Sequence, residues 1–311
     1  MDDYTKKTRD WLEERFRQVD ENGIYYAHQP IYGFRKGHCD PGSLNRFIAT
    51  YHIMKTLSHI EFNSLLDVGG AEGYTAFLIR EIFHAKVKTS DLSLEACKRT
   101  KEIFNIDSQP ADIHNLPYKD NAFDVVLCSE TLEHVTDVRR ATHELLRVCK
   151  KALVITVPYE SHETIDQNIR EKTPHAHIHG FDLNTFNFLK TEGHQIFSRK
   201  IRSSYLKIPF LLVEAMPDTF AFHATKRNYP KIFIHIYNFF IPLLQNIIGK
   251  KIAAFLVRLD NFIARNISPY NGIIFLILIE ENCHTKNKRK SISVRRIMDL
   301  VVSYHYLPDT N

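Results

Sequence analysis

The sequence predicts an α/β protein with a doubly wound, mostly parallel sheet. Short apolar runs that suit buried strands alternate along the chain with longer segments of helical periodicity. A glycine-rich turn over residues 65–74 joins the first of these strands to a helix, and acidic residues follow several of the strands. The chain has 311 residues, 44% of them hydrophobic, so it can bury a sizeable core and is not a disordered protein.

The N-terminal segment, residues 1–60, is expected to be helical. Residues 4–19 place Trp11, Leu12 and Phe16 on one face of an amphipathic helix, which either covers the site as a lid or packs on the domain. An aromatic loop over residues 25–34 follows. The sequence Asp-Pro-Gly-Ser at residues 40–43 is then a start signal for a helix that reaches about residue 59.

The stretch Leu65 to Tyr74 predicts a strand, a tight loop and a helix. Glycines in such a loop allow a positive φ and a close approach of the backbone to a ligand. No Lys-Ser/Thr pair follows the last glycine, and Asp67 just before the turn would repel a pyrophosphate. Asp67 suits a cation instead, such as the ammonium of a methionine moiety.

This loop resembles the first motif of the class I S-adenosylmethionine-dependent methyltransferases, an acidic residue followed by glycines at alternate positions. Gly69 and Gly73 match, whereas Ala71 replaces the middle glycine. Because alanine favours ordinary φ and ψ angles, the loop is expected to differ slightly there. The resemblance implies S-adenosylmethionine as the cofactor and a seven-stranded Rossmann-like sheet.

Two further segments extend the resemblance. A second strand at about residues 85–89 ends at Asp91 and Leu92, where the family's acidic residue binds the ribose hydroxyls. Asp91 has an alternative role as the N-cap of a helix over residues 94–104. At Asp112 and Ile113 the family binds the adenine amino group and packs against the ring.

Residues 123–128 read as a buried strand, and the segment 129–135 after it is expected to begin a helix that reaches about residue 149. Another strand covers residues 152–157. Ligands of parallel sheets bind at the carboxyl ends of strands, so the residues following these strands should meet there. The expected cofactor-binding residues are Asp67, Gly69, Gly70, Ala71, Gly73, Asp91, Leu92, Asp112, Ile113 and Glu130.

The resemblance covers residues 61–206 and 271–283. Beyond Pro158 the sequence predicts a polar loop to residue 173, a histidine-rich run over residues 174–181 and a short helix over residues 186–191. Residues 194–201 resemble the late antiparallel strand of this fold, and the last strand is expected over residues 272–281.

An insertion over residues 207–270 is not required by the core fold. Its stretch 232–248 is strongly apolar, but polar residues and a proline interrupt it and argue against a membrane-spanning helix. Peripheral membrane contact through residues 231–258, a pocket for an apolar acceptor, and helices packed on the core are the alternatives. The basic tail, residues 284–311, is expected to be solvated, and its lack of interleaved aromatic residues makes nucleic acid an improbable partner.

The compartment follows from the cysteines and the N-terminus. The five cysteines show no paired spacing, and the acidic start Met-Asp-Asp-Tyr does not resemble a secretory signal. We therefore expect a cytoplasmic protein, with membrane contact limited to the periphery. The sequence does not indicate an oligomeric state.

The catalytic candidates are His179, His134 and Glu130. His179 lies in the loop after the fifth strand and is the candidate base or acceptor contact. Glu130, Glu133 and His134 would share one helical face and, with His177 or His179, could ligate a divalent metal. That set resembles the metal site of small-RNA 3′-terminal methyltransferases. It also resembles the Glu-His-Val segment of the quinone-biosynthesis O-methyltransferases, in which these residues lie beside the methyl donor. We expect no metal.

The predicted function is O-methylation of a small or lipid-linked acceptor by in-line displacement, with the cofactor and acceptor aligned away from water. The first alternative is metal-dependent methylation of a 3′-terminal RNA ribose. The second is a cofactor-binding partner subunit without catalysis, which Ala71 suggests.

Overall fold

Seven strands form one continuous sheet in the order β3-β2-β1-β4-β5-β7-β6. The computed structural model describes residues 1–20, 23–32, 43–171, 173–203, 249–266, 270–280, 283 and 292–300. The strands are β1 (Ser64–Val68), β2 (Lys86–Asp91), β3 (Asp107–Pro110), β4 (Phe123–Ser129), β5 (Cys149–Pro158), β6 (Gln195–Ser203) and β7 (Tyr270–Leu278). The predicted mostly parallel, seven-stranded Rossmann-like sheet is confirmed.

Strands β1 to β5 are parallel to one another, whereas β7 runs antiparallel to both β5 and β6. The strand order reverses between β1 and β4, and this switch point is where doubly wound sheets bind ligands. Strands β6 and β7 remain paired up to the residues Ser203 and Tyr270.

Two apolar layers cover the faces of the sheet. Successive side chains of a strand point to opposite faces, and Leu65 accordingly packs in one core cluster while Leu66 packs in the other. The first cluster includes residues of α2 (Ser43–Leu57), α3 (Tyr74–Phe83), α10 (Gly249–Asn266) and α11 (Val294–Asp299), and the second includes residues of α5 (Val138–Val148). Near-continuous apolar strands are buried on both sides for this reason.

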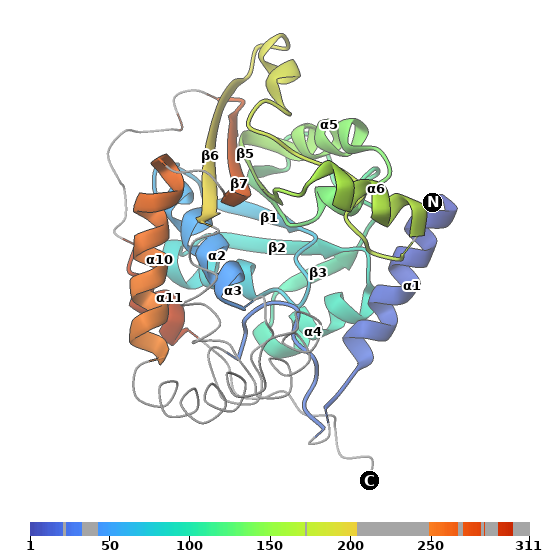
Figure 1. Ribbon diagram of the computed structural model, residues 1–311, viewed down its shortest axis with the longest axis horizontal. Coiled ribbons are helices and arrows are strands. Elements are labelled where there is room, and N and C mark those ends of the chain that lie inside the picture. The colour runs from blue at the N-terminus through green and yellow to red at the C-terminus, as the bar shows by residue number, and fades with distance from the viewer. Residues whose placement is uncertain are drawn as a thin grey trace.

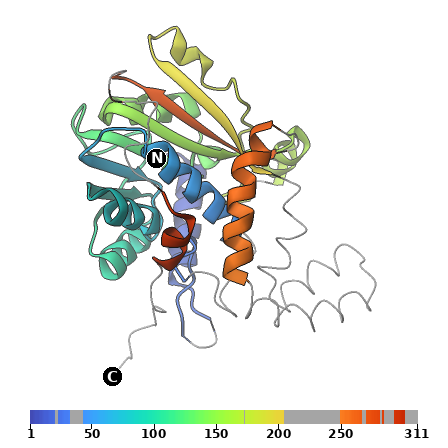
Figure 2. The same cartoon turned by 90° about the vertical axis from the view of Figure 1, so that its left-hand side faces the viewer.

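Helices α1 (Asp3–Arg17) and α10 lie toward opposite edges of the sheet (Figure 1). Helix α1 contacts α4 (Leu94–Phe104), which packs on β3 at one edge, while α10 packs on β6 at the other. Figure 2 shows α10 standing alongside the sheet from the perpendicular direction. Among the described residues of the predicted N-terminal lid, α1 and His28 line the ligand cavity, whereas α2 is buried in the core.

Local signals explain several helix starts. The Ser93 side chain accepts a hydrogen bond from the backbone N–H of Ala96 and caps α4, so the alternative that Asp91 is the N-cap was wrong. Asp137 caps α5 in the same way. The helix expected from residue 129 to 149 is therefore broken. A single 3₁₀ turn, Leu132–His134, precedes α5.

Other sequence expectations were also wrong. The polar loop expected after Pro158 contains α6 (His162–Glu171), and the short helix over 186–191 is a 3₁₀ turn, Asn187–Lys190. The region expected as a solvated tail contains α11, whose Val294, Ile297 and Met298 are buried in the core. The apolar stretch 232–248 lies outside the described residues, as does most of the insertion and the tail.

Candidate functional site

One cavity lies at the carboxyl ends of β1, β2, β3 and β4, beside the switch point of the sheet. Helix α1 and two loop histidines complete its wall. The lining residues are Thr5, Thr8, Leu12, Phe16, His28, Val68, Gly69, Ala71, Asp91, Leu92, Ala111, Asp112, Ile113, His114, Glu130, Thr131, His134, Val135 and His175. The structure thus brings the residues predicted after these four strands to one place.

The glycine loop is tied to the end of β2. The backbone N–H groups of Gly69 and Gly70 both donate to the Ser90 carbonyl oxygen, at 2.8 and 3.2 Å. Ala71 has a φ of 47°, so it adopts the left-handed conformation that a glycine would take, and the expectation of ordinary angles there was wrong. Its N–H donates to Oδ2 of Asp91, 2.9 Å away, which holds the loop in this path.

Two buried carboxyl groups lie under the cavity. Asp91 lines it and also accepts from the N–H of Ser93, 2.9 Å from Oδ1, while burial raises the pKa of its side chain to about 6. Asp67 lies behind the lining, and its Oδ2 has no hydrogen-bond partner among the described residues. Burial, and then the charge of Asp91, raise the pKa of Asp67 to about 7. Both groups are therefore poised for a polar or cationic ligand.

Asp112 and Ile113 form the far wall. Oδ1 of Asp112 accepts from the backbone N–H and from Nδ1 of His114, at 3.0 and 2.7 Å, and these bonds lower the pKa of Asp112. Ile113 is buried in the second core cluster and still reaches the cavity. An apolar side chain beside an oriented carboxylate suits a flat heterocycle with an exocyclic amine.

Glu130 sits at the end of β4 in a left-handed conformation, with a φ of 52°. Such a conformation is costly for a side chain that is not glycine and is common at functional sites. Its Oε2 lies 2.8 Å from Nη1 of Arg202, and its Oε1 accepts from Oγ1 of Thr156 at 3.0 Å. The Arg202 backbone N–H in turn donates to Oδ2 of the buried Asp260 on α10. The Arg202 pairing connects β6 and α10 with the cavity.

Histidine rings form much of the remaining wall. His134 stacks on His175 with ring centroids 3.7 Å apart, and Trp11 of α1 stacks on the other side of His175 at 4.9 Å. Burial and neighbouring histidines lower the pKa of His134 well below its usual range. Burial likewise lowers the pKa values of His28 and His175 to about 3. These imidazoles are neutral at pH 7.

His179, expected to be the base, does not line the cavity. Its Nε2 lies 2.6 Å from the carbonyl oxygen of Val135, an acceptor, so this nitrogen carries the proton and donates it. That geometry removes Nε2 as a base. His134, by contrast, lines the cavity as expected for a catalytic candidate.

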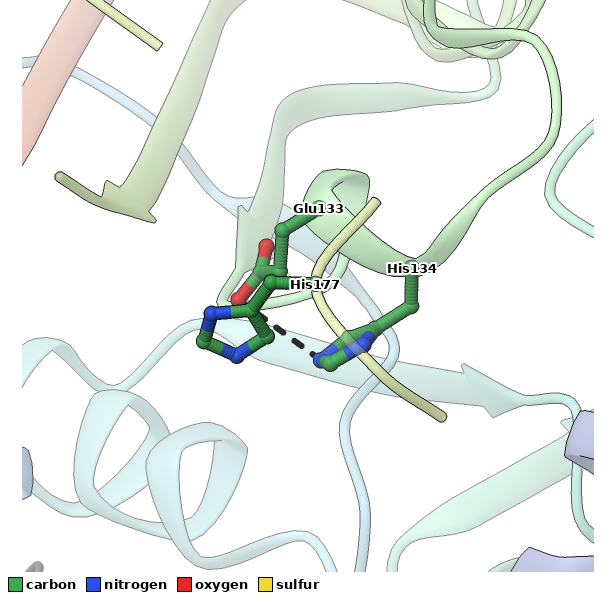
Figure 3. A group of neighbouring side chains, drawn as sticks. All are labelled: Glu133, His134 and His177. Atoms are coloured by element: carbon green, nitrogen blue, oxygen red, sulfur yellow. Dashed lines mark ion pairs between the residues drawn. The ribbon is translucent and has the colours of Figure 1, made fainter. Parts of the chain in front are cut away.

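The predicted metal set is brought together only in part. Among the described residues, Glu133, His134 and His177 each offer one ligand atom, and these atoms lie within 4.8 Å of one another (Figure 3). Glu130 is not in the cluster, because its carboxylate is paired with Arg202. The expectation that Glu130, Glu133 and His134 share one helical face was wrong, because Glu130 follows the end of β4 and only Glu133 and His134 lie in the 3₁₀ turn. His177 follows α6.

The Glu13 side chain fixes helix α1 to the start of α4. The backbone N–H groups of Leu94 and Glu95, at the start of α4, donate to Glu13 at 2.5 and 3.1 Å. Helix N-termini carry partial positive charge that favours such a contact. Leu12 and Phe16, which the sequence placed on the apolar face of α1, line the cavity.

Several site residues were not predicted. Arg202 lies 72 positions from Glu130, and no local pattern marks their pairing. His28 and His175 belong to the aromatic loop and the histidine-rich run that the sequence singled out, but neither was given a role. A useful signal was the concentration of histidines in residues 174–181, which stack across the chain onto His134.

Comparisons with known proteins agree with this architecture. Residues 66–155 match the family described as a methyltransferase domain. Over 118 residues the chain is 28% identical to norajmaline N-methyltransferase of Rauvolfia serpentina, covering 36% of this chain and 40% of that protein. Over 104 residues it is 26% identical to the uncharacterized methyltransferase YcgJ of Bacillus subtilis, covering 32% and 41%. The chain thus spans about two fifths of the length of these curated relatives.

A solved structure shares the fold. Phosphoethanolamine N-methyltransferase 2 of Haemonchus contortus, in complex with S-adenosyl-L-methionine, superposes with a TM-score of 0.52 at 16% identity. The match covers 88% of this chain and 60% of that one. Residues 66–155 thus match a methyltransferase domain, which supports the predicted class I S-adenosylmethionine-dependent methyltransferase, and the solved structure shares the fold. Across the described ranges, no helix is both long and apolar enough to cross a membrane.

Proposed function

We propose that the chain transfers a methyl group from S-adenosylmethionine to an oxygen atom of a small or lipid-linked acceptor. The observation that carries this proposal is the single cavity that joins the glycine loop and the acidic strand ends to Glu130 and His134. A methyltransferase must hold the donor and the acceptor in one water-poor space, because in-line transfer depends on their alignment.

The residues on the strand ends fit the cofactor. Asp91 presents an oriented carboxylate suited to ribose hydroxyls, while Asp112 and Ile113 suit the adenine ring. Gly69 leaves a cradle, since a Cβ there would lie 2.1 Å from Oγ1 of Thr131. The unpartnered Oδ2 of Asp67 supports a cationic group nearby, such as the amino group of the methionine moiety.

When bound, S-adenosylmethionine supplies an electrophilic methyl group on a sulfonium that leaves as a neutral thioether, taking the bonding electron pair. The acceptor oxygen contributes the electron pair of the new carbon–oxygen bond and loses its proton. His134 can take that proton: its Nδ1 donates to the Ala176 carbonyl oxygen at 3.1 Å, which leaves the lone pair on Nε2. Its lowered pKa keeps the ring neutral, so Nε2 is unprotonated before the transfer.

The acceptor class is proposed from the cavity-lining residues that are not assigned to the cofactor. Leu12, Phe16 and Val135 are apolar, and the neutral histidines add hydrogen-bonding groups without charge. Such a surface suits an uncharged hydroxyl on an apolar body. The exposed Phe255 of α10 supports the lipid-linked option and a peripheral membrane contact within residues 231–258, and the exposed Phe262 lies one helical turn beyond that range.

The test begins with the cofactor. Isothermal titration with S-adenosylhomocysteine should show micromolar binding that Asp91→Ala abolishes and Asp91→Asn weakens at least tenfold. Asp107→Ala is the matched control, because that aspartate is an exposed residue of β3 paired only with Lys101 on the surface. Absence of binding to the unmodified chain, or equal binding by Asp91→Ala, would contradict the proposal.

The acceptor is then sought with radiolabelled S-adenosylmethionine and fractionated extracts. Label in an alkali-stable ether within the lipid or small-molecule fraction is the expected result. Label in RNA would favour the alternative of ribose methylation. The basic tail that suggested this alternative lies mainly outside the described residues. Cofactor binding without transfer to any fraction would favour the inactive-subunit alternative, although Ala71 gives it no support once its backbone takes the path of a glycine.

A further inference from the structure

We propose that Glu133, His134 and His177 bind a divalent transition-metal ion at the edge of the cofactor cavity. One ligand atom from each residue lies within 4.8 Å of the other two. Donors around a zinc-sized ion stand roughly 3.3–3.5 Å apart, as expected from metal–ligand distances near 2.1 Å. Small side-chain rotations close the remaining gap. Figure 3 shows the Glu133 carboxylate and both imidazole rings turned toward one another.

Hydrogen bonds orient both histidines as metal ligands. Nδ1 of His134 lies 3.1 Å from the Ala176 carbonyl oxygen, and Nδ1 of His177 lies 3.0 Å from Oε1 of Glu160. Each partner is an acceptor, so each Nδ1 carries the proton and each Nε2 keeps its lone pair. Metal-binding histidines are held in this way by a backbone carbonyl or a carboxylate on the other ring nitrogen. The cluster contains one example of each.

Glu133 gives an independent indication of a ligand. Its side chain is only 1% exposed, and its Oε2 has no hydrogen-bond partner among the described residues. Oε1 lies 3.7 Å from Nε2 of His134, too far for a hydrogen bond. Burying a carboxyl oxygen without a partner is unfavourable, and a cation bound between Glu133 and the two rings removes that cost.

The donor set favours particular metals. Two imidazoles and one carboxylate suit Zn²⁺, Co²⁺, Mn²⁺ or Fe²⁺, whereas Mg²⁺ and Ca²⁺ prefer all-oxygen sites. Three protein ligands leave coordination positions open, which is typical of catalytic rather than structural sites. Because His134 is also a cavity residue, the ion would lie where an acceptor enters.

The substrate class can be narrowed on the basis of the proposed function. A metal at this position binds an acceptor hydroxyl and lowers its pKa, so His134 acts as a ligand and is not required as the base. An acceptor with a second oxygen next to the hydroxyl, such as a vicinal diol or a hydroxy acid, would chelate the ion. We infer that this is the preferred acceptor geometry.

The test measures metal binding directly, on the untagged full-length chain after treatment with a chelator. Titration with Co²⁺ should produce visible ligand-field absorption that saturates at one ion per chain, and calorimetry with Zn²⁺ should give micromolar or tighter affinity. Glu133→Gln and His177→Gln should each weaken binding about 100-fold. Glu160→Ala, which removes the acceptor for Nδ1 of His177, should weaken it about 10- to 100-fold.

His143→Gln is the matched control. It belongs to another histidine–glutamate pair, with Nε2 3.1 Å from Oε2 of Glu192, but lies on the exposed side of α5. This variant should bind Co²⁺ like the unmodified chain. Saturation of the unmodified chain with no loss in Glu133→Gln and His177→Gln would overturn the site, as would no binding by the unmodified chain.

Titration of each variant with S-adenosylhomocysteine separates this site from the proposed function. Metal loss with retained cofactor binding supports the metal site in a folded protein. Should Glu133→Gln fail to fold, the partly exposed His177 provides the deciding variant. Metal binding without cofactor binding in the unmodified chain would refute the proposed function and leave the metal site standing.

Discussion

Arg202 and Glu130 form an ion pair at the inner edge of the cavity, with Nη1 of Arg202 2.8 Å from Oε2 of Glu130. The arginine side chain is buried and also donates from Nη2 to the Val157 carbonyl oxygen at 3.2 Å. The pair fixes the carboxylate that closes β4, and several consequences of this arrangement can be measured.

Arg202→Met should release Glu130 from its position and leave a partly buried carboxylate without its cation. Because Glu130 is 28% exposed, we expect a loss of about 1–3 kcal/mol in the free energy of unfolding, below the value for a fully buried pair. Affinity for S-adenosylhomocysteine should fall about tenfold. Urea unfolding and calorimetric titration measure the two effects, and unchanged affinity would exclude a role for the pair in the site.

Gly272→Ala tests the same pair without removing either charge. A Cβ at this position on β7 would lie 2.2 Å from Nε of Arg202, so the flexible guanidinium must move away from Glu130. We expect the cofactor affinity to fall about as much as in Arg202→Met. In the double variant the two losses should not add, because both act through one interaction. Fully additive losses would contradict this explanation.

The Asp67 carboxyl gives a pH-dependent prediction. Its pKa is about 7 in the folded chain and near 3.8 when exposed, so between these values the folded state binds the extra proton. Stability therefore falls as pH rises from about 4 to 7, by as much as about 4 kcal/mol from this group. Asp67→Asn should remove that fall and be the more stable protein at pH 8 without cofactor, while binding the cofactor less tightly.

Urea unfolding of both proteins at pH 5 and pH 8 checks this expectation. The difference between the unmodified chain and Asp67→Asn isolates this group from the other buried acids, which titrate in both. An equal pH dependence in the two proteins would show that Asp67 is ionised in the folded state.

Gly69→Ala separates backbone strain from steric conflict. Gly69 has a φ of 74°, and a Cβ would lie 2.1 Å from Oγ1 of Thr131. Gly193 has a φ of 92° and nothing within 4 Å of its Cβ position, so Gly193→Ala reports strain alone. We expect a loss of about 1–2 kcal/mol for Gly193→Ala, a larger loss for Gly69→Ala, and loss of cofactor binding only for Gly69→Ala. Equal losses would mean that Thr131 moves freely.

Glu13→Ala should loosen α1 over the cavity. The substitution removes both hydrogen bonds to the start of α4, and we expect cofactor dissociation to become about 5- to 10-fold faster. Glu14→Ala is the control, because this neighbouring glutamate of α1 has an exposed side chain. Stopped-flow dissociation and amide hydrogen exchange of residues 3–17 provide the measurements. Identical dissociation rates in the two variants would show that α1 does not retain the ligand.

The histidines give opposite expectations for two neighbouring candidates. His134→Gln should lower turnover of the acceptor at least 100-fold with cofactor affinity within about threefold, because Nε2 is lost at the cavity wall. His179→Gln should retain most activity, since glutamine can still donate to the Val135 carbonyl oxygen. Initial rates with the identified acceptor decide between them, and a reversed order would restore His179 as the base.

The parallel core was predictable because its strands are apolar on both faces and are followed by glycine, acidic residues or proline. Strand β3 was not predicted, since it is a largely exposed edge strand of polar residues. Helix α6 buries only Ile165, so its apolar periodicity was too weak to distinguish it from a loop. In both elements, packing and hydrogen bonding to neighbours outweigh the local pattern.

The residues of the site also divide into those that the sequence predicted and those that it did not. Asp91 was found because it follows a predicted strand, and Asp112 was found through the resemblance to the methyltransferase motifs. The pairing of Glu130 with Arg202, and the stacking of His175 between Trp11 and His134, join segments distant in sequence. Those contacts depend on the folded arrangement, so no spacing of residues in the sequence predicts them.

Strands β6 and β7 meet at Ser203 and Tyr270, so the whole intervening chain leaves and rejoins the sheet at one pair of residues. The entropy of closing such an excursion grows only with the logarithm of its length. Segments of very different size can therefore be exchanged at this point while the register of all seven strands is kept. The hairpin therefore makes the chain between Ser203 and Tyr270 a module that can be replaced without changing the strands that carry the donor site.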